Sequence, residues 1–213
     1  TTYYQLETTC TVSAMTATTS VVSFSVVNPG PCICNNYGSS NSTSTLDEEI
    51  WNVSFGSLNN TSSCSSVGPG PGSLQNKYSN YAGFVAAPSV MQGQSVAYNI
   101  DINTCGGWYG MEFDIYIDYN QNGLFTDAGE QVVNNTNAIQ GNNSGAITIP
   151  LTANIGVTRM RVVAVEGTVP GPTGTYGYGE TEDYCIVITG SVACAGTPSS
   201  GIASISTNTG CVN

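Results

Sequence analysis

The chain has 213 residues and a formal net charge of −11, with 3 Lys and Arg residues against 14 Asp and Glu residues and no His. So few cations exclude a nucleic-acid surface, which needs Lys and Arg to displace phosphate counterions, and they disfavour anionic membranes. The lack of His excludes Ser–His and Cys–His catalysis. No apolar run approaches the roughly 20 residues of a membrane-spanning helix, so we expect no membrane insertion. The acidic balance favours divalent cations as partners.

Short runs of β-branched and aromatic residues predict an all-β fold. We expect strands at 3–10, 20–27, 49–57, 81–86, 95–102, 111–118, 146–149, 158–166 and 183–189. Turn residues separate these runs about every ten residues, which is typical of a β-sandwich or jelly roll. The Pro- and Gly-rich stretches 28–31 and 68–72 are the strongest breaks in the pattern.

The two ends of the chain differ from its middle. The run from Cys194 to Cys211 looks like the opening of an immunoglobulin-like repeat, and the run from Thr1 to Cys10 looks like the closing strands of one. We therefore expect closing Ig-like strands at 1–28, a sandwich domain at 29–190 and an opening Ig-like strand at 191–213. Either the chain is a fragment of a longer protein, or the tail of one subunit completes the head of the next by strand addition.

Eight cysteines indicate a disulfide framework. Their even number, without a zinc-binding pattern, favours an oxidising extracellular or cell-surface location over free buried thiols. Spacing does not determine the pairing. The local candidates are Cys34–Cys64 and Cys194–Cys211, because each pair closes a short loop. A bridge from Cys211 to Cys10 would instead join neighbouring subunits of a filament.

The segment 118–130 has the pattern of a calcium loop. Calcium takes six to eight oxygen ligands at about 2.3–2.6 Å, and oxygens at alternate positions of a tight loop converge on one point. Gly123 at the sixth position permits the sharp turn. The candidate Ca²⁺ ligands are Asp118, Asn120, Asn122, the Leu124 carbonyl, Asp127 and Glu130.

Two features of this segment differ from an EF-hand. Glu130 lies one position beyond the usual twelfth-residue glutamate, and the flanks are predicted as strand and loop instead of helices. The alternative is a turn that needs no ion, because Asn and Asp side chains bond to their own backbone in turns. Both interpretations stay open at this point.

Four motifs in order carry a family resemblance. They are Ile115–Gly123, Phe125–Glu130, Thr158–Val162 and Gly179–Tyr184, with weaker likeness at Cys34–Tyr37 and Glu48–Val53. Together they resemble the GEVED domain of multidomain secreted bacterial proteins, over about residues 30–190, with Thr181 in place of the name-giving Val. The resemblance implies an extracellular β-sandwich appended to proteases, adhesins or surface proteins, often exported through the type IX route. It implies no catalytic activity.

The basic residues of 158–163 need partners. Side chains alternate along a strand, so Arg159 and Arg161 share one face. If they are partly buried they must pair with carboxylates, and Glu180, Glu182 and Asp183 are the candidates. The alternative is that both arginines are solvated on an outer face.

The preferred function is structural. We expect a non-enzymatic structural or adhesive module of a bacterial surface protein or filament, rigidified by calcium and disulfides, whose partners are copies of itself or neighbouring repeats. The alternative is a carbohydrate-binding accessory module of a larger secreted enzyme, because aromatic rings stack on sugars. The candidate glycan-stacking residues are Trp108, Tyr109, Tyr176 and Tyr178.

Overall fold

The computed structural model describes residues 35–191, residues 32–33 and four short strands near the N-terminus. These strands are β1 (Thr2–Tyr4), β2 (Glu7–Thr9), β3 (Thr16–Thr18) and β4 (Val22–Phe24). β1 pairs antiparallel with β4, and β2 pairs antiparallel with β3. In the part of the chain described, no helix has the length and apolarity to cross a membrane.

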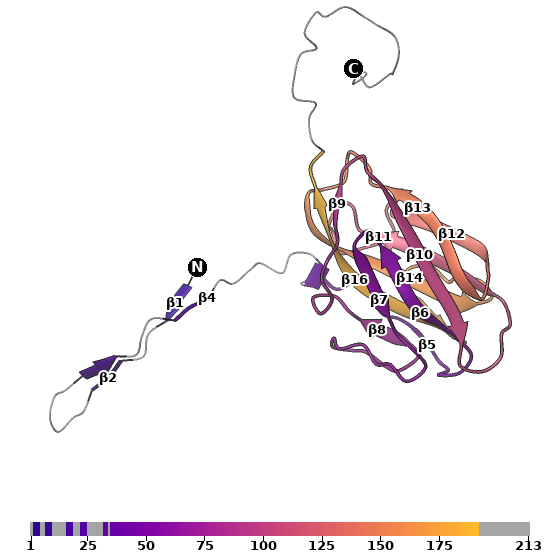
Figure 1. Cartoon of the computed structure of the whole chain (residues 1–213), viewed down its shortest axis with the longest axis horizontal. Coiled ribbons are helices and arrows are strands. Elements are labelled where there is room, and N and C mark those ends of the chain that lie inside the picture. Colours follow the sequence, from indigo (N-terminus) through magenta and orange to yellow (C-terminus); the bar gives the residue numbers. More distant parts are fainter. Residues whose placement is uncertain are drawn as a thin grey trace, which may run out of the picture.

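Residues 35–191 contain two main sheets (Figure 1). The four-stranded sheet has the order β13-β10-β6-β7 and the six-stranded sheet the order β12-β11-β14-β16-β8, with β9 also paired to β16. The smaller sheet comprises β6 (Glu48–Phe55), β7 (Leu58–Thr61), β10 (Ser95–Thr104) and β13 (Gly141–Thr148). The larger comprises β8 (Tyr78–Asn80), β9 (Ser89–Met91), β11 (Met111–Ile117), β12 (Gln131–Ala138), β14 (Gly156–Glu166) and β16 (Gly179–Thr189).

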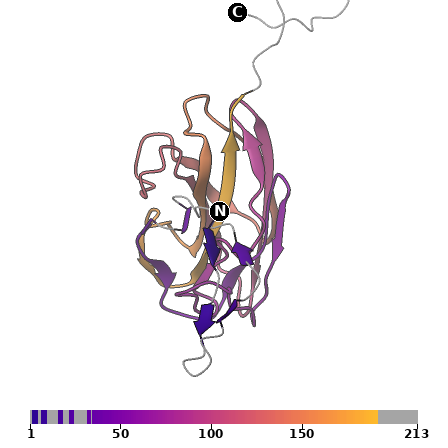
Figure 2. The same cartoon turned by 90° about the vertical axis from the view of Figure 1, so that its left-hand side faces the viewer.

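The main core lies between these two sheets. Phe113 of β11, Val162 of β14 and Ile186 of β16 belong to one fully buried cluster with Val53 and Ile100 of the smaller sheet. Side chains of alternate residues point to one face of a strand, so each strand contributes every second residue to this cluster. Burying each such side chain stabilises the fold by roughly 1.5–3 kcal/mol. The expected all-β sandwich is confirmed (Figure 2).

A second layer covers the outer face of the larger sheet. It contains the parallel pair β5 (Ser40–Ser42) and β15 (Gly174–Tyr176). Tyr37, Phe125 and Tyr176 from this layer form a smaller buried cluster with Val163 and Val165 of β14. Central strands of the larger sheet are therefore buried on both faces, which decides how the charged residues of β14 and β16 behave.

The expected strands at 49–57, 95–102, 111–118, 158–166 and 183–189 correspond to β6, β10, β11, β14 and β16. The strand expected at 81–86 was wrong. That segment is a turn in which the Phe84 and Val85 amides donate to the Tyr81 carbonyl, and Gly83 has φ +81°. The Asn-rich β12 and most of β13 were missed, because their composition does not favour strands and their pairing to β11 and β10 does.

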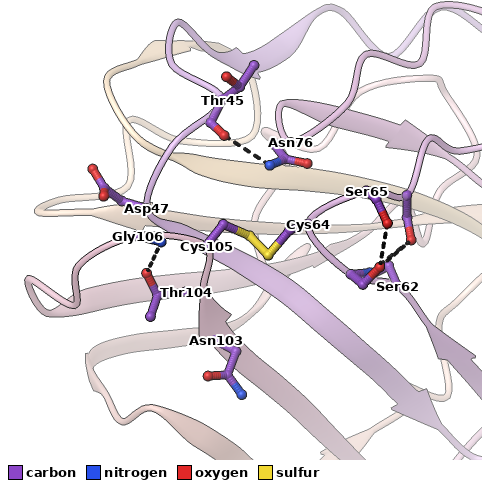
Figure 3. The surroundings of a disulfide bond; sticks show 12 residues. Thr45, Asp47, Ser62, Cys64, Ser65, Asn76, Asn103, Thr104, Cys105 and Gly106 are labelled. Carbon is purple, nitrogen blue, oxygen red and sulfur yellow. Dashed lines mark hydrogen bonds between the residues drawn. A yellow bond between two sulfur atoms is a disulfide. The ribbon is translucent and has the colours of Figure 1, made fainter.

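Two disulfides lie within the described residues, Cys32–Cys185 and Cys64–Cys105, each with a Cα–Cα distance of 5.6 Å. The predicted Cys34–Cys64 bridge was wrong. β7 and β10 both pair antiparallel with β6, so the segments that follow them emerge at the same end of the sheet and bring Cys64 to Cys105 (Figure 3). Cys10, Cys34, Cys194 and Cys211 lie outside the described residues, and the other predicted bridges stay predictions.

Candidate functional site

The predicted calcium loop connects β11 to β12. At its base the Ile117 amide donates to the Glu130 carbonyl at 2.9 Å. The loop turns through left-handed backbone at Gln121, with φ 62°, and at Gly123, with φ 88°. A Cβ atom at Gly123 would lie 3.0 Å from the Asn35 side chain. The sixth position of the loop is therefore restricted to glycine both by its backbone and by its neighbour.

Asp118 anchors the loop from a buried position. Its Oδ2 accepts hydrogen bonds from the Tyr37 hydroxyl at 2.7 Å and from the Gly123 amide at 2.9 Å. Its Oδ1 accepts from the Asn122 amide at 3.2 Å. The first predicted ligand is thus held in a fixed orientation toward the turn.

Three further predicted ligands converge at the mouth of the loop. The Nδ2 atoms of Asn120 and Asn122 donate to Asp127 Oδ2 at 2.9 and 2.7 Å, and these hydrogen bonds lower the pKa of Asp127. The Oδ1 atoms accept from the Asn122 and Leu124 amides at 3.0 and 2.9 Å, as Asn oxygens do in ion-free turns. To bind calcium, the two amides would have to direct their oxygens toward Asp127.

Glu130 ends the loop and is 2% exposed. Its Oε1 accepts hydrogen bonds from the Tyr119 and Asn120 amides at 3.0 and 3.4 Å. Its Oε2 is buried and has no hydrogen-bond partner among the described residues. Burial raises the pKa of Glu130, and the nearby carboxylates of Asp118 and Asp127 raise it further. An oxygen-rich loop with a buried carboxylate oxygen left over fits the ligand chemistry of Ca²⁺.

The GEVED-like motif, Gly179–Tyr184, lies in β16 and presents Asp183 to the outer face. Arg161 donates from Nε to Asp183 Oδ1 at 2.7 Å and from Nη2 to Oδ2 at 2.8 Å, and Arg159 Nη1 lies 3.3 Å from Oδ2. The Tyr78 hydroxyl also donates to Oδ2 at 2.8 Å. Although burial alone would raise the pKa of Asp183, the two guanidinium groups and this hydroxyl lower it. The expected pairing of the arginines is confirmed for Asp183.

The other two candidate partners of the arginines point the opposite way. Glu180 and Glu182 face the main core, where Glu180 accepts from the Ser79 hydroxyl at 2.7 Å and Glu182 from the Tyr184 hydroxyl at 2.7 Å. Neither forms a salt bridge within the described residues. Burial raises the pKa of both. The prediction that they could neutralise the arginines was therefore wrong for these two residues.

A third buried carboxyl lies near them. Glu49 of β6 is 2% exposed, and its Oε1 has no hydrogen-bond partner in the described part of the chain. Burial, reinforced by the charge of Glu180, raises the pKa of Glu49 to about 8. Sequence reasoning missed this residue; the signal was a Glu pair at the start of an otherwise apolar strand.

The candidate glycan-stacking residues divide into two pairs. Trp108 is partly buried against the main core. Tyr176 is buried in the outer cluster, with its hydroxyl 2.8 Å from that of Thr181, so its ring is not open to a sugar. Tyr109 and Tyr178 are 68% and 37% exposed. They line a surface pocket of about 170 Å³ together with Asp47 and Glu166.

Comparison with known proteins supports the family resemblance. Residues 112–187 match the GEVED domain, a shorter range than the expected 30–190. The match runs from β11 through β16 and includes the calcium-type loop, both arginines and the motif in β16. No curated protein matches the chain. The boundaries expected at 1–28 and 191–213 stay predictions. Residues 112–187 of this chain form a GEVED domain.

Proposed function

We propose that this chain is a non-enzymatic structural module of an extracellular surface protein. We also propose that the loop 118–130 binds a Ca²⁺ ion that stabilises the folded domain. The observation that carries the proposal is the convergence of Asn120, Asn122 and Asp127 at the mouth of a loop whose last carboxylate, Glu130, keeps one buried oxygen without a partner in the described residues. Calcium takes six to eight oxygen ligands, and an ion bound in the loop would give this buried oxygen a partner.

The contacts of the loop explain why an ion there would act on the whole sandwich. Asp118 bonds to Tyr37 in the outer layer, and its carbonyl accepts from the Thr158 hydroxyl of β14 at 2.5 Å. Asn154 Nδ2 donates to the Asn120 carbonyl at 2.6 Å. A ligand that binds only the folded state stabilises it by about 2.7 kcal/mol at a free concentration of 100 times Kd.

Thermal unfolding with and without calcium tests this function. We expect millimolar CaCl₂ to raise the Tm of the chain and EDTA to reverse the increase. Asp127→Asn should remove most of the calcium-dependent increase, because ligand charge sets affinity. Glu112→Gln, which removes the same charge from a half-exposed position outside the loop, should keep it. If EDTA has no effect on the Tm, the loop is a turn that needs no ion.

The extracellular location is supported by the two disulfides, since such bonds persist in oxidising compartments. The proposal also includes assembly with copies of the chain or neighbouring repeats, through strand exchange between 194–213 and 1–27 with Cys211 bridging Cys10. This part rests on the sequence. Disulfide-linked ladders on non-reducing electrophoresis would support the covalent form of assembly, whereas monomers alone would refute it.

A second candidate function is carbohydrate binding by an accessory module. It is favoured by one observation: Tyr109 and Tyr178, both exposed, line the same pocket as the carboxylates of Asp47 and Glu166. Aromatic faces stack on sugars and carboxylates accept hydrogen bonds from their hydroxyls. A glycan array with hits that Tyr109→Ala abolishes would support this function, and hits that survive the substitution would remove Tyr109 from it.

A further inference from the structure

The two neighbouring arginines of β14 differ in how fully they are bonded. All five N–H groups of Arg161 have acceptors: two oxygens of Asp183 and the carbonyls of Tyr37, Gly38 and Pro172. An Arg saturated in this way has no capacity left for a ligand. Its role is to tie the outer layer to the sheet.

Arg159 is bonded less completely. Its Nη1 contacts Asp183 and its Nη2 donates to the Cys32 carbonyl, while its Nε is buried and has no acceptor among the described residues. The residue is only 7% exposed, and its guanidinium lies 4.5 Å from the centre of the Tyr37 ring. A buried cationic donor without an acceptor is costly, and a carboxylate is its best partner.

A cavity of about 260 Å³ lies beside Arg159. Arg159 and Arg161 line it, together with Tyr78 and the polar segment 35–41. The polar residues of this segment that line the cavity are Asn35, Asn36, Tyr37, Ser39, Ser40 and Asn41.

Four charged side chains lie at or next to the cavity. Two arginines line it against the single carboxylate, Asp183, that pairs with them in the described residues. The nearby Asp118 is engaged by the Tyr37 hydroxyl and makes no salt bridge to either arginine there. The two arginines and the two carboxylates therefore balance in charge, and the preference for an anionic ligand rests on the Arg159 Nε that has no acceptor among the described residues.

We propose that this cavity binds a sugar acid, with its carboxylate at Arg159 and its hydroxyl groups at the amides and hydroxyls of segment 35–41. Arg binds carboxylates through a planar fork of donors, and Asn and Ser side chains both donate to and accept from hydroxyl groups. The volume is below the roughly 300–1,000 Å³ of sites for drug-sized ligands, which fits a single sugar residue. The site is separate from the Tyr109–Tyr178 pocket.

Isothermal titration of the full chain with glucuronate, galacturonate and N-acetylneuraminate tests the proposal, with glucose and acetate as controls. We expect at least one sugar acid to bind, glucose not to bind, and acetate to bind more weakly by at least about tenfold because it lacks the hydroxyl contacts. Equal binding of glucose and the sugar acids, or no binding by the folded chain, would overturn the proposal. Stronger binding of an acidic peptide in competition would also overturn it.

Variants at Ser39 test whether the ligand binds in this cavity and leave the buried arginines unchanged. Ser39 is exposed and lines the cavity. Ser39→Asp adds a negative charge and should weaken sugar-acid binding by about tenfold or more through like-charge repulsion. Ser39→Asn has similar size without the charge and should bind within about threefold of the native chain. Equal affinities of the two variants would show that the ligand binds elsewhere.

Discussion

The two faces of β16 hold carboxyl groups that are similarly buried but have different partners. On the outer face Asp183 is paired with Arg159 and Arg161, and its pKa is lowered. On the inner face Glu180 and Glu182 accept hydrogen bonds from hydroxyl groups and form no salt bridge within the described residues, and burial raises their pKa. Burial alone therefore does not decide whether a carboxyl group in this fold is charged; the partner that the strand alternation gives it does.

The two faces should differ in what they contribute to stability. The outer face holds the ion pairs of Asp183 with Arg159 and Arg161, called the clasp below. Through Arg161 it also bonds segment 37–38 and Pro172 to the sheet. The inner face is a group of carboxyl groups that favour the protonated form, with Glu49 opposite them on β6. Disrupting the ion pairs of the outer face should destabilise the chain throughout the pH range in which Asp183 is ionised, whereas the inner face should make stability depend on pH.

The largest expected effect is that of Asp183→Asn. The substitution leaves two buried guanidinium groups without their carboxylate, and breaking a buried ion pair costs about 3–5 kcal/mol. Urea unfolding at pH 7 measures the loss. Glu112→Gln is the control and should change the free energy of unfolding by less than about 0.5 kcal/mol. Equal midpoints for the two variants would show that the clasp contributes nothing.

The next effect is a fall in stability with rising pH. Folded Glu49 keeps its proton to about pH 8, whereas a Glu of ordinary pKa loses it near 4.5. The folded state thus binds more protons between these values, so the stability present below pH 4.5 is lost as the pH rises toward 8. At about 1.4 kcal/mol per pKa unit, Glu49→Gln should remove up to about 3–4 kcal/mol of the decline between pH 5 and pH 8.

Urea unfolding of the native chain and Glu49→Gln at pH 5 and pH 8 measures that difference. Glu112→Gln, whose carboxyl is half-exposed, should show the same decline as the native chain. A native chain that becomes more stable between pH 5 and pH 8 would contradict the inner-face account.

The smallest effect compares two tyrosine hydroxyls. Tyr78 donates to the ionised Asp183 and Tyr184 donates to Glu182. A hydrogen bond to a charged group contributes about 1.5–3 kcal/mol and a neutral one about 0.5–1.5 kcal/mol. Tyr78→Phe should therefore destabilise the chain more than Tyr184→Phe at pH 5, as measured by urea unfolding. The reverse order would mean that the two faces have been assigned the wrong charges.

Much of the fold followed from local pattern, and the errors have physical causes. Phe113, Ile115 and Ile117 alternate with polar residues and gave β11 correctly. The Asn-rich β12 has no such signal, since its strand conformation depends on pairing with β11. Segment 81–86 has strand-like residues, but Gly83 adopts a left-handed turn and the Tyr81 amide bonds to the Asp183 carbonyl.

The candidate sites were predictable to different degrees. Strand alternation placed Arg159 and Arg161 on one face, and the same rule applied to β16 separates Asp183 from Glu180 and Glu182. The Cys64–Cys105 bridge depends on which strands flank β6, and the spacing of the cysteines in the sequence does not determine this order. The cavity at Arg159 is formed by segment 35–41 folding over β14, a contact between distant parts of the sequence.

The central claim is that the loop 118–130 holds a calcium ion. Isothermal titration of the metal-stripped, intact chain with CaCl₂ tests it most directly, with Asp127→Asn and Glu112→Gln titrated alongside. The account predicts saturable binding of one ion per chain that Asp127→Asn weakens by about tenfold or more and Glu112→Gln leaves unchanged. No heat of binding to the folded native chain, or equal binding by Asp127→Asn, would contradict it.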